Sequence, residues 1–252
     1  MKEVRTSYHR VAVLPSQSRF LRHSLFIILL YMNNIQLVVF DIAGTTVQDT
    51  GNVAKAFIDA FGEFNMEIPA DTVNHVMGFR KIDAIKMLVP DDSNSALIEQ
   101  IHKAFTRNML DLFKNDPDLK PLPYTEEIFL QLKQAGVKIA LNTGFTRTVT
   151  NAILKRLQWN TPDMIDMVIC SDEVPEGRPQ PYMIQNIMAQ LNVTDSKAVA
   201  KVGDTKVDVE EGRNAGCGLV VSVTTGAYSR EELELYQPDH IIDSLSELPE
   251  LL

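Results

Sequence analysis

Five short apolar runs constrain the fold of this chain more than any other feature of its sequence. Stretches with the periodicity of amphipathic helices lie between the later runs, at residues 126–134, 148–157 and 181–191. Strands and helices that alternate in this way are typical of a parallel sheet buried on both faces. We therefore predict an α/β fold with a doubly wound, Rossmann-like parallel sheet, whose strands are expected at residues 35–40, 137–142, 167–170, 198–203 and 219–223.

The connection after the first predicted strand does not follow this pattern. Between residues 52 and 122 the sequence shows only helical periodicity, with Val53 and Phe57 among the apolar residues that share one face. Such a segment is far longer than a crossover helix needs. We expect it to form a helical cap domain (residues 52–122) above the strand ends, inserted into an α/β core made of residues 32–51 and 123–252.

The first 31 residues differ in charge from the rest of the chain. They contain five lysine or arginine residues and one acidic residue, and an apolar run follows at residues 25–30. This run is too short for a transmembrane helix. A signal peptide has the same order of segments, but no small-residue cleavage site follows, and a transit peptide fits less well. We expect Met32 to be the true start and residues 1–31 to be a disordered tail or a mis-assigned extension.

Charge and cysteine usage restrict the partners and the compartment. The formal net charge is −9, and no basic patch interleaved with aromatic residues stands out, so nucleic-acid binding is not expected. Membrane association is not expected either. The two cysteines, Cys170 and Cys217, lack metal-ligand spacing and are expected to be reduced thiols. We therefore predict a cytoplasmic protein that acts on a small molecule.

Polar residues follow four of the predicted strands. Asp41 ends the first, Thr143 and Gly144 end the second, Arg178 lies in the loop after the third, and Asp204 follows the fourth. Because ligands bind at the carboxyl ends of parallel strands, we expect these groups to form one site. Each also has a local explanation, as a turn residue, a helix cap or a surface ion-pair partner. Their occurrence together favours function.

The carboxylates among them suit metal-assisted phosphoryl transfer, which needs an in-line nucleophile and neutralisation of the phosphoryl oxygens. We predict that Asp41 is the nucleophile, forming an aspartyl-phosphate. Asp41 and Asp204 are expected to bind one Mg²⁺, a cation that prefers oxygen ligands. The backbone carbonyl of Ala43 is expected to be a further ligand, because its methyl side chain cannot be one. Asp208 is expected to orient the ligands rather than to bind the metal.

Neighbouring donors are predicted to hold the phosphoryl group. Gly44 and Thr45 offer backbone N–H groups and a hydroxyl directly after the nucleophile. Thr143 and Gly144 offer the same kinds of group after the second strand. Arg178 is a fixed cation that can donate two parallel hydrogen bonds to a phosphoryl group. We expect these residues to bind the substrate.

The residue two positions after Asp41 restricts the leaving group. A hydrolase that cuts phosphate esters through an aspartate commonly has a second aspartate there, which protonates the departing alkoxide. This chain has Ala43 instead. The alanine therefore disfavours an ordinary phosphate ester hydrolase, and it indicates that the leaving group is activated elsewhere in the site.

The combination of Asp41, Thr143, Arg178, Asp204 and Asp208 resembles the haloacid dehalogenase superfamily. Within it, residues 41–46, 174–181 and 201–216 are similar to the nucleophile sequence, arginine loop and metal loop of the phosphonoacetaldehyde hydrolases, or phosphonatases. The resemblance extends from residue 35 to about residue 229. It implies a Mg²⁺-dependent hydrolase with a capped α/β core that acts on a small phosphonate or phosphate.

Residues 77–83, Met-Gly-Phe-Arg-Lys-Ile-Asp, resemble the cap motif of the same family. In that family the lysine forms a Schiff base with the substrate aldehyde, so the resemblance implies this role for Lys81 and a substrate contact for Met77. The iminium withdraws electrons, and the C–P bond then breaks with an enamine as leaving group. An enamine carbon needs no acid beside the nucleophile, which agrees with Ala43. Without such a motif, a lysine is usually a solvated surface residue.

One position departs from the family pattern. Phosphonatases have a histidine directly after Lys-Ile-Asp, implied to move protons to and from the lysine, and this chain has Ala84. The Lys81 amine must still lose a proton before it attacks an aldehyde. His75, six residues away, would lie on a different helix face, which leaves Asp83 or water. The open alternatives are cleavage of another phosphonate, a phosphomonoesterase for a small phosphorylated metabolite, and a fold retained as a binding module.

The resemblance also implies a homodimer formed through the caps. The aromatic residues Phe57, Phe61 and Phe64 recur on one helix face of the predicted cap. They are expected to form either that dimer contact or the cap's own core.

Overall fold

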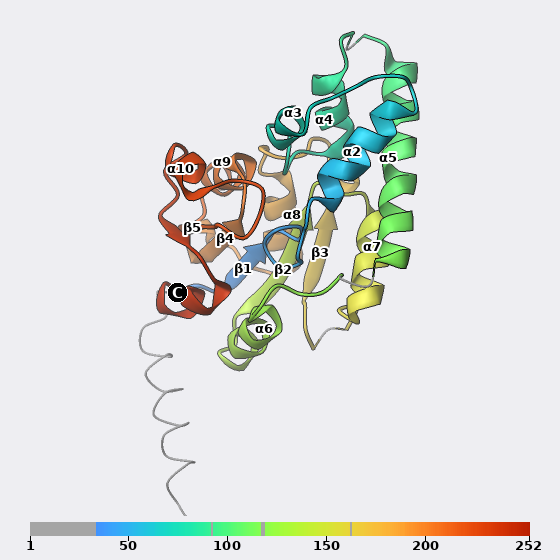
Figure 1. The fold of residues 1–252 in the computed structure, drawn as a ribbon. Coiled ribbons are helices and arrows are strands. Elements are labelled where there is room, and N and C mark those ends of the chain that lie inside the picture. Colours follow the sequence, from blue (N-terminus) through green and yellow to red (C-terminus); the bar gives the residue numbers. More distant parts are fainter. Residues whose placement is uncertain (1–33, 92, 117–118, 162) are drawn as a thin grey trace, which may run out of the picture.

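The computed structural model describes residues 34–91, 93–116, 119–161 and 163–252. The expectations for residues 1–31 and for a start at Met32 lie outside the described residues. Within these ranges, six parallel strands form one sheet at the centre of the molecule, in the order β3-β2-β1-β4-β5-β6 (Figure 1). The strands are β1 (Leu37–Phe40), β2 (Lys138–Thr143), β3 (Met167–Cys170), β4 (Val199–Gly203), β5 (Leu219–Val223) and β6 (His240–Ile242).

The predicted α/β fold class is confirmed, and five of the six strands coincide with the predicted apolar runs. β3 and β5 match the prediction residue for residue, and the other three differ by one or two residues at their ends. The prediction missed β6, a strand of three residues that pairs with β5 at the edge of the sheet and begins with an exposed histidine. So short a strand offers no readable alternation of apolar and polar residues.

Helices cover both faces of the sheet. Successive side chains of a strand point to opposite faces, and Phe40 packs with α6 and α7 while Val39 packs with α8 and α9. The Phe40 ring lies 5.2 Å from the ring of Phe129 on α6. These helices are α6 (Thr125–Gln134), α7 (Arg147–Leu157), α8 (Tyr182–Gln190) and α9 (Lys206–Asn214), followed by α10 (Arg230–Glu234). Short 3₁₀ segments lie at Ser171–Glu173, Ser196–Ala198 and Leu245–Glu250.

In the described part of the chain, four further helices lie between β1 and α6, and we call them the inserted helices. They are α2 (Asn52–Gly62), α3 (Ala70–Asn74), α4 (Lys81–Leu88) and α5 (Ser95–Asn115), in blue to green at the upper right of Figure 1. The helix α5 packs against α2 and α4 and also against α7 beside the sheet. Phe57 and Phe61 are completely buried within the chain, and Phe64 is half-buried. This aromatic face therefore serves as packing inside the inserted helices, which favours the core role over the dimer contact.

The two connections to the inserted helices lie side by side. The backbone N–H of Gln48, on the way in, donates to the carbonyl of Lys120, on the way out, at 3.1 Å. The N–H of Leu122 donates in turn to the carbonyl of Thr46 at 2.9 Å. The inserted helices are thus joined to the sheet by a hydrogen-bonded pair of segments next to the end of β1.

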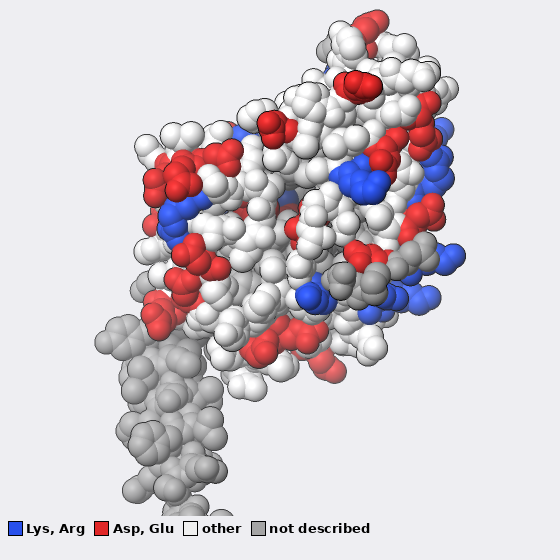
Figure 2. Space-filling view, in the orientation of Figure 1, with Lys and Arg blue, Asp and Glu red and all other residues white. Residues whose placement is uncertain are grey.

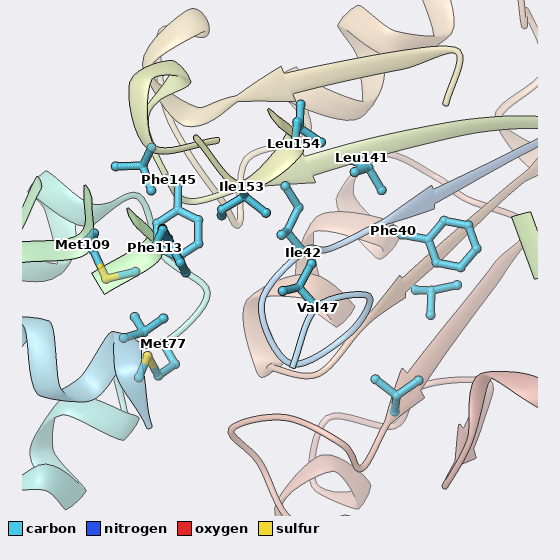
Figure 3. Close-up of a cluster of buried hydrophobic side chains, with 14 of the residues drawn as sticks. Phe40, Ile42, Val47, Met77, Met109, Phe113, Leu141, Phe145, Ile153 and Leu154 are labelled. Carbon is cyan, nitrogen blue, oxygen red and sulfur yellow. The ribbon is translucent and has the colours of Figure 1, made fainter. Parts of the chain in front are cut away.

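Apolar side chains from the inserted helices and from the sheet layer meet in one cluster. Figure 3 shows Met77, Met109 and Phe113 turned toward Phe145, which follows β2. The rings of Phe113 and Phe145 are 6.2 Å apart and nearly perpendicular. Burial of this cluster stabilises the placement of α5 over the carboxyl end of the sheet.

No helix in the described part of the chain is long and apolar enough to cross a membrane. On the face that Figure 2 shows, lysine and arginine side chains gather mainly at the right edge, around α5 and α7, with acidic side chains among them. Acidic side chains are prominent on the opposite edge, around α10. Side chains of both signs thus lie on this face of a chain whose formal net charge is −9.

Candidate active site

Asp41 lies directly after β1, at the carboxyl edge of the sheet, and its side chain is buried. Its backbone N–H donates to the carbonyl of Val202 on β4 at 2.9 Å, and its carbonyl accepts from the Thr46 hydroxyl at 2.9 Å. The turn from Asp41 to Thr46 depends on Gly44, whose φ is +84°. A Cβ at this position would lie 2.6 Å from Oδ2 of Asp204, so only glycine fits.

Asp204, after β4, faces the same turn. Its Oδ2 accepts a hydrogen bond from the backbone N–H of Ala227 at 2.7 Å, and its Oδ1 accepts one from the Thr45 hydroxyl at 3.3 Å. Burial raises the pKa of Asp204 well above its ordinary value, and the carboxylates of Asp41 and Asp208 add to this rise. Burial also raises the pKa of Asp41, although the charge of Arg178 opposes it. Two buried carboxylates thus share one end of the sheet.

This donor set suits a magnesium ion. Asp41, Asp204 and Ala43 line one cavity, and a divalent cation there would offset the cost of burying the two carboxylates. Within the described ranges, no three His, Cys, Asp or Glu side chains form a metal cluster. A site here would therefore use two carboxylates and a backbone carbonyl, with water in the remaining positions, as Mg²⁺ commonly does.

The Arg178 guanidinium is hydrogen-bonded to protein groups on all sides. Its Nη1 donates to Oδ1 of Asp41 at 2.6 Å, its Nη2 donates to both the carbonyl and the side-chain oxygen of Asn142 at 2.6 Å, and its Nε donates to Glu211 at 3.0 Å. Burial alone would lower the pKa of Arg178, but carboxylates, with that of Asp208 foremost, outweigh burial and raise it. Arg178 does not line the cavity in this arrangement. It holds the carboxylate of Asp41 in a fixed orientation.

Three polar residues behind this arginine had no role assigned to them from the sequence. Asn142 donates to both carboxylate oxygens of Glu211 at 2.8 Å, and Lys201 donates to the side-chain oxygen of Asn142 at 2.8 Å. Lys201 also forms an ion pair of 2.9 Å with Asp208, whose other oxygen accepts from the Thr205 hydroxyl at 2.6 Å. Together, Arg178 and Lys201 outweigh burial and lower the pKa of Asp208. The signal available in the sequence was a lysine inside an apolar strand, which requires a buried partner.

The segment from Met77 to Lys81 lies directly on the loops that follow the strands. The backbone N–H of Lys81 donates to the carbonyl of Gly144 at 3.2 Å. A Cβ on Gly144 would lie 2.2 Å from the carbonyl oxygen of Phe79, and a Cβ on Gly78 would lie 2.3 Å from the Thr205 hydroxyl. Glycine on both sides of the contact therefore lets two backbones approach closely.

Lys81 is the first residue of α4, and the residue is only 5% exposed. Its Nζ lies 5.6 Å from the ring centre of Phe57 on α2 and 5.2 Å from that of Phe145. Burial lowers the pKa of Lys81 to about 8, against the opposing charge of Asp41. A buried amine with a lowered pKa is poised to act as a nucleophile toward a carbonyl group.

Seven of the predicted site residues line one cavity of about 30 Å³, and these are Asp41, Ala43, Met77, Lys81, Thr143, Gly144 and Asp204. The other four predicted residues lie behind the lining. Gly44 and Thr45 contact Asp204, while Arg178 and Asp208 contact each other. The sequence reading missed other lining residues, among them Asp49, Val53 and Phe145. A cavity of this size holds one or two water molecules. We therefore expect the inserted helices to move when a substrate enters.

The residues around Ala84 do not reach this cavity. The methyl group of Ala84 is completely buried on α4. Asp83 lines a separate surface hollow together with Arg80 and Lys86, and His75, at the end of α3, is exposed. The sequence offered His75 and Asp83 as replacements for the family histidine. Neither side chain lines the cavity with Lys81.

Comparison with known proteins agrees with this arrangement. The family described as haloacid dehalogenase-like hydrolase matches residues 38–222. A phosphonoacetaldehyde hydrolase of Bordetella pertussis is 30% identical, over 86% of this chain and 91% of its own length.

Two solved structures share the fold. A phosphonoacetaldehyde hydrolase-like protein of Oleispira antarctica has a TM-score of 0.73 at 20% identity, covering 86% of this chain and 90% of its own. CbbY of Rhodobacter sphaeroides, in complex with xylulose-(1,5)bisphosphate, has a TM-score of 0.72 at 19% identity, covering 85% and 96%.

Proposed function

The chain belongs to the haloacid dehalogenase-like hydrolases, and from that premise we propose that it cleaves the C–P bond of phosphonoacetaldehyde or a related phosphonate. The observation that carries the proposal is the pairing of Lys81 with Asp41 in one cavity that has Ala43 beside the nucleophile. Ala43 provides no acid to protonate a leaving group. Lys81 makes such an acid unnecessary, because it activates the carbon leaving group as an iminium. The 30% identity to a phosphonoacetaldehyde hydrolase supports the same reaction.

On the carbon side, the neutral amine of Lys81 attacks the aldehyde, and loss of water gives an iminium. The positive nitrogen draws electrons from the C–P bond, so that the carbon departs as an enamine. The rings of Phe57 and Phe145 exclude water from the amine, which keeps a share of it neutral near pH 8. They also accommodate the iminium charge on their faces.

On the phosphorus side, Asp41 attacks and becomes an aspartyl-phosphate. Arg178, held by Asn142 and Glu211, presents the carboxylate in one orientation. Thr143 and Gly144 line the cavity and offer donors to the phosphoryl oxygens. A magnesium ion held by Asp41, Asp204 and the Ala43 carbonyl would neutralise phosphoryl charge. Water then hydrolyses the aspartyl-phosphate, while protonation of the enamine and hydrolysis of the imine return the lysine and release the aldehyde product.

A second candidate is a phosphomonoesterase that acts on a small phosphorylated metabolite. The fold shared with CbbY, which was solved with a sugar bisphosphate, favours it. Ala43 speaks against it, because an alkoxide leaving group would lack its acid. A third reading, a binding module without activity, disagrees with family membership and with the carboxylates gathered at the sheet end.

The deciding experiment traps the imine. The protein is incubated with phosphonoacetaldehyde and sodium borohydride, and the reduced adduct is mapped by mass spectrometry. We expect one adduct, on Lys81, that is absent from Lys81→Ala. The matched control is Lys86→Ala, because Lys86 lies on the same helix but is exposed. Absence of an adduct from the unmodified protein, together with hydrolysis of phosphate esters by Lys81→Ala, would establish the second candidate instead.

A further inference from the structure

Lys81 must release a proton to attack an aldehyde and must deliver one for water to leave, yet no group is assigned to this transfer. Its Nζ has no hydrogen-bond partner among the described residues. The position that holds a histidine in phosphonatases is the buried Ala84, and Asp83 lines a different hollow. The proton acceptor therefore has to come from another element that lines the cavity.

Among the residues that the structure describes, three carboxylates line the cavity with Lys81: those of Asp41, Asp49 and Asp204. Asp41 is hydrogen-bonded to Arg178, and Asp204 accepts hydrogen bonds on both oxygens, from Ala227 and Thr45. In the proposed function, both are also engaged by the phosphoryl group and the metal. Of these three described carboxylates, that of Asp49 remains for proton transfer.

Asp49 is held in place by one of its two oxygens. Its Oδ1 accepts hydrogen bonds from the backbone N–H groups of Gly51 at 3.1 Å, Asn52 at 2.8 Å and Val53 at 3.4 Å, at the start of α2. Its Oδ2 has no such partner in the described ranges. The same helix carries Phe57, whose ring flanks the Lys81 amine. One short segment thus places both the Asp49 carboxylate and the Phe57 ring near Lys81.

We propose that Asp49 is the group that moves protons to and from Lys81, through a water molecule in the cavity that they share. This inference rests on the proposed function and adds the residue that replaces the family histidine. The cavity of about 30 Å³ has room for that water. Proton exchange by a placed carboxylate is a common device in imine chemistry and contributes roughly 10²–10⁴ in rate.

The proton balance of the step closes without another reactant. The Asp49 carboxylate takes a proton from the Lys81 ammonium, and the neutral amine attacks the carbonyl carbon. A second proton passes from the nitrogen to the former carbonyl oxygen, which gives a carbinolamine. Asp49 returns its proton to this hydroxyl, which departs as water and leaves the iminium. Hydrolysis of the product imine runs through the same transfers in reverse.

The charges that face Lys81 allow proton transfer to be distinguished from a purely electrostatic role. These charges are Asp41, Arg178, Asp49 and Asp204. The negative charge of Asp49 raises the pKa of Lys81, while burial lowers it. If Asp49 acted by charge alone, its removal would give more neutral amine at pH 7 and faster imine formation. If it carries the proton, its removal slows the reaction.

The test is the rate of borohydride trapping with phosphonoacetaldehyde, measured for Asp49→Asn between pH 6 and pH 9 (about the ordinary working range of such enzymes). An asparagine keeps the oxygen that accepts from the start of α2 but cannot take a proton. We expect a loss of about 10²-fold at pH 7. The remaining rate should climb about tenfold per pH unit up to the pKa of Lys81, since the variant depends on amine that is already neutral. The unmodified protein should show a much flatter profile.

The control variant is Asp83→Asn, which removes a carboxylate two residues from Lys81 that lies outside the cavity. It should trap at the unmodified rate, and thermal melting should show that both variants are folded. A rate and profile for Asp49→Asn equal to those of the unmodified protein, or a faster rate at pH 7, would overturn the inference and leave the proposed function intact. Failure of the unmodified protein itself to form an adduct would overturn both.

Discussion

Burial of Lys81 costs stability, and in the proposed function it makes the amine reactive. Its side chain lies between two aromatic rings, and its pKa falls from an ordinary value of 10.5 to about 8. A group that binds its proton less tightly in the folded state opposes folding wherever the unfolded chain holds that proton. Functional sites often carry such a cost, because the feature that gives activity is unfavourable for folding.

Replacing Lys81 by methionine should therefore stabilise the protein. The unfolded chain binds more protons than the folded chain between pH 8 and pH 10.5, so the cost is complete below pH 8 and fades as the pH rises through this window. We expect Lys81→Met to raise the free energy of unfolding at pH 7 by about 3 kcal/mol at most. Denaturant unfolding at pH 7 and pH 10 would measure it.

The pH dependence separates this cause from simple repacking. The advantage of Lys81→Met should shrink between pH 8 and pH 10, whereas a packing gain would be equal at both. Lys86→Met, on the exposed side of α4, should change stability at neither pH. A variant at position 81 that is less stable at pH 7 than the unmodified protein would contradict the account of a buried, weakly protonated lysine.

At the level of elements, the site is assembled where the inserted helices touch the strand-end loops. Gly144 and Gly78 allow the approach of backbone to backbone that places Lys81 beside Asp41. The two connections to the inserted helices are also hydrogen-bonded to each other, at Gln48 and Lys120. In the proposed function we expect this contact to open and close in each cycle, because a cavity of about 30 Å³ leaves little room for a substrate.

Substituting Gly144 by alanine should impair turnover more than folding. The added methyl group would lie 2.2 Å from the Phe79 carbonyl, which is backbone and cannot turn aside. The inserted helices would then seat out of place, and a displacement of about 1 Å can cost roughly 10²-fold in rate. We expect a loss of at least tenfold in kcat with a modest decrease in the melting temperature.

Gly62 offers a matched control for this prediction. It lies at the end of α2, where a Cβ would meet nothing within 4 Å. Gly62→Ala should leave kcat unchanged and should not lower the melting temperature, since alanine favours the helix. Equal kcat values for Gly144→Ala and the unmodified protein would show that the close contact is not required for turnover.

At the scale of the whole molecule, most of the fold could be predicted from the sequence. The apolar runs located β1 to β5 because strands buried on both faces carry a continuous signal. The short edge strand β6 carried no such continuous apolar signal. The division into a core and a cap stays a prediction, and α5 packs against α7 as well as against its neighbours in the insert.

The site could be predicted only in part, for a physical reason. Residues at strand ends, such as Asp41 and Asp204, could be placed because the sheet imposes their position. Asp49 and Glu211 could not be assigned from the sequence, because each depends on a long-range contact. Asp49 lies in the cavity lining, and Glu211 contacts Arg178. Arg178 was expected to bind the phosphoryl group, yet its donors are directed to Asp41, Asn142 and Glu211.

The two buried carboxylates make a prediction for the whole protein. Mg²⁺ that binds the folded chain alone should stabilise it, by about 2.7 kcal/mol at a concentration of 100 times the Kd. We expect Mg²⁺ to raise the melting temperature, and EDTA to reverse this and abolish turnover. The Asp204→Asn variant should lose the Mg²⁺-dependent shift. An equal shift in Asp204→Asn would place the ion elsewhere.

The most direct test of the central claim follows phosphorus through the reaction. Phosphonoacetaldehyde is incubated with the protein and Mg²⁺, and ³¹P NMR records the loss of phosphonate and the gain of inorganic phosphate. We predict that phosphate and acetaldehyde appear in equal amounts, and that Asp41→Asn and Lys81→Ala each abolish the conversion. Persistence of the phosphonate signal of this and related aldehydes, under conditions in which the same preparation hydrolyses phosphate esters, would contradict the assignment of C–P cleavage.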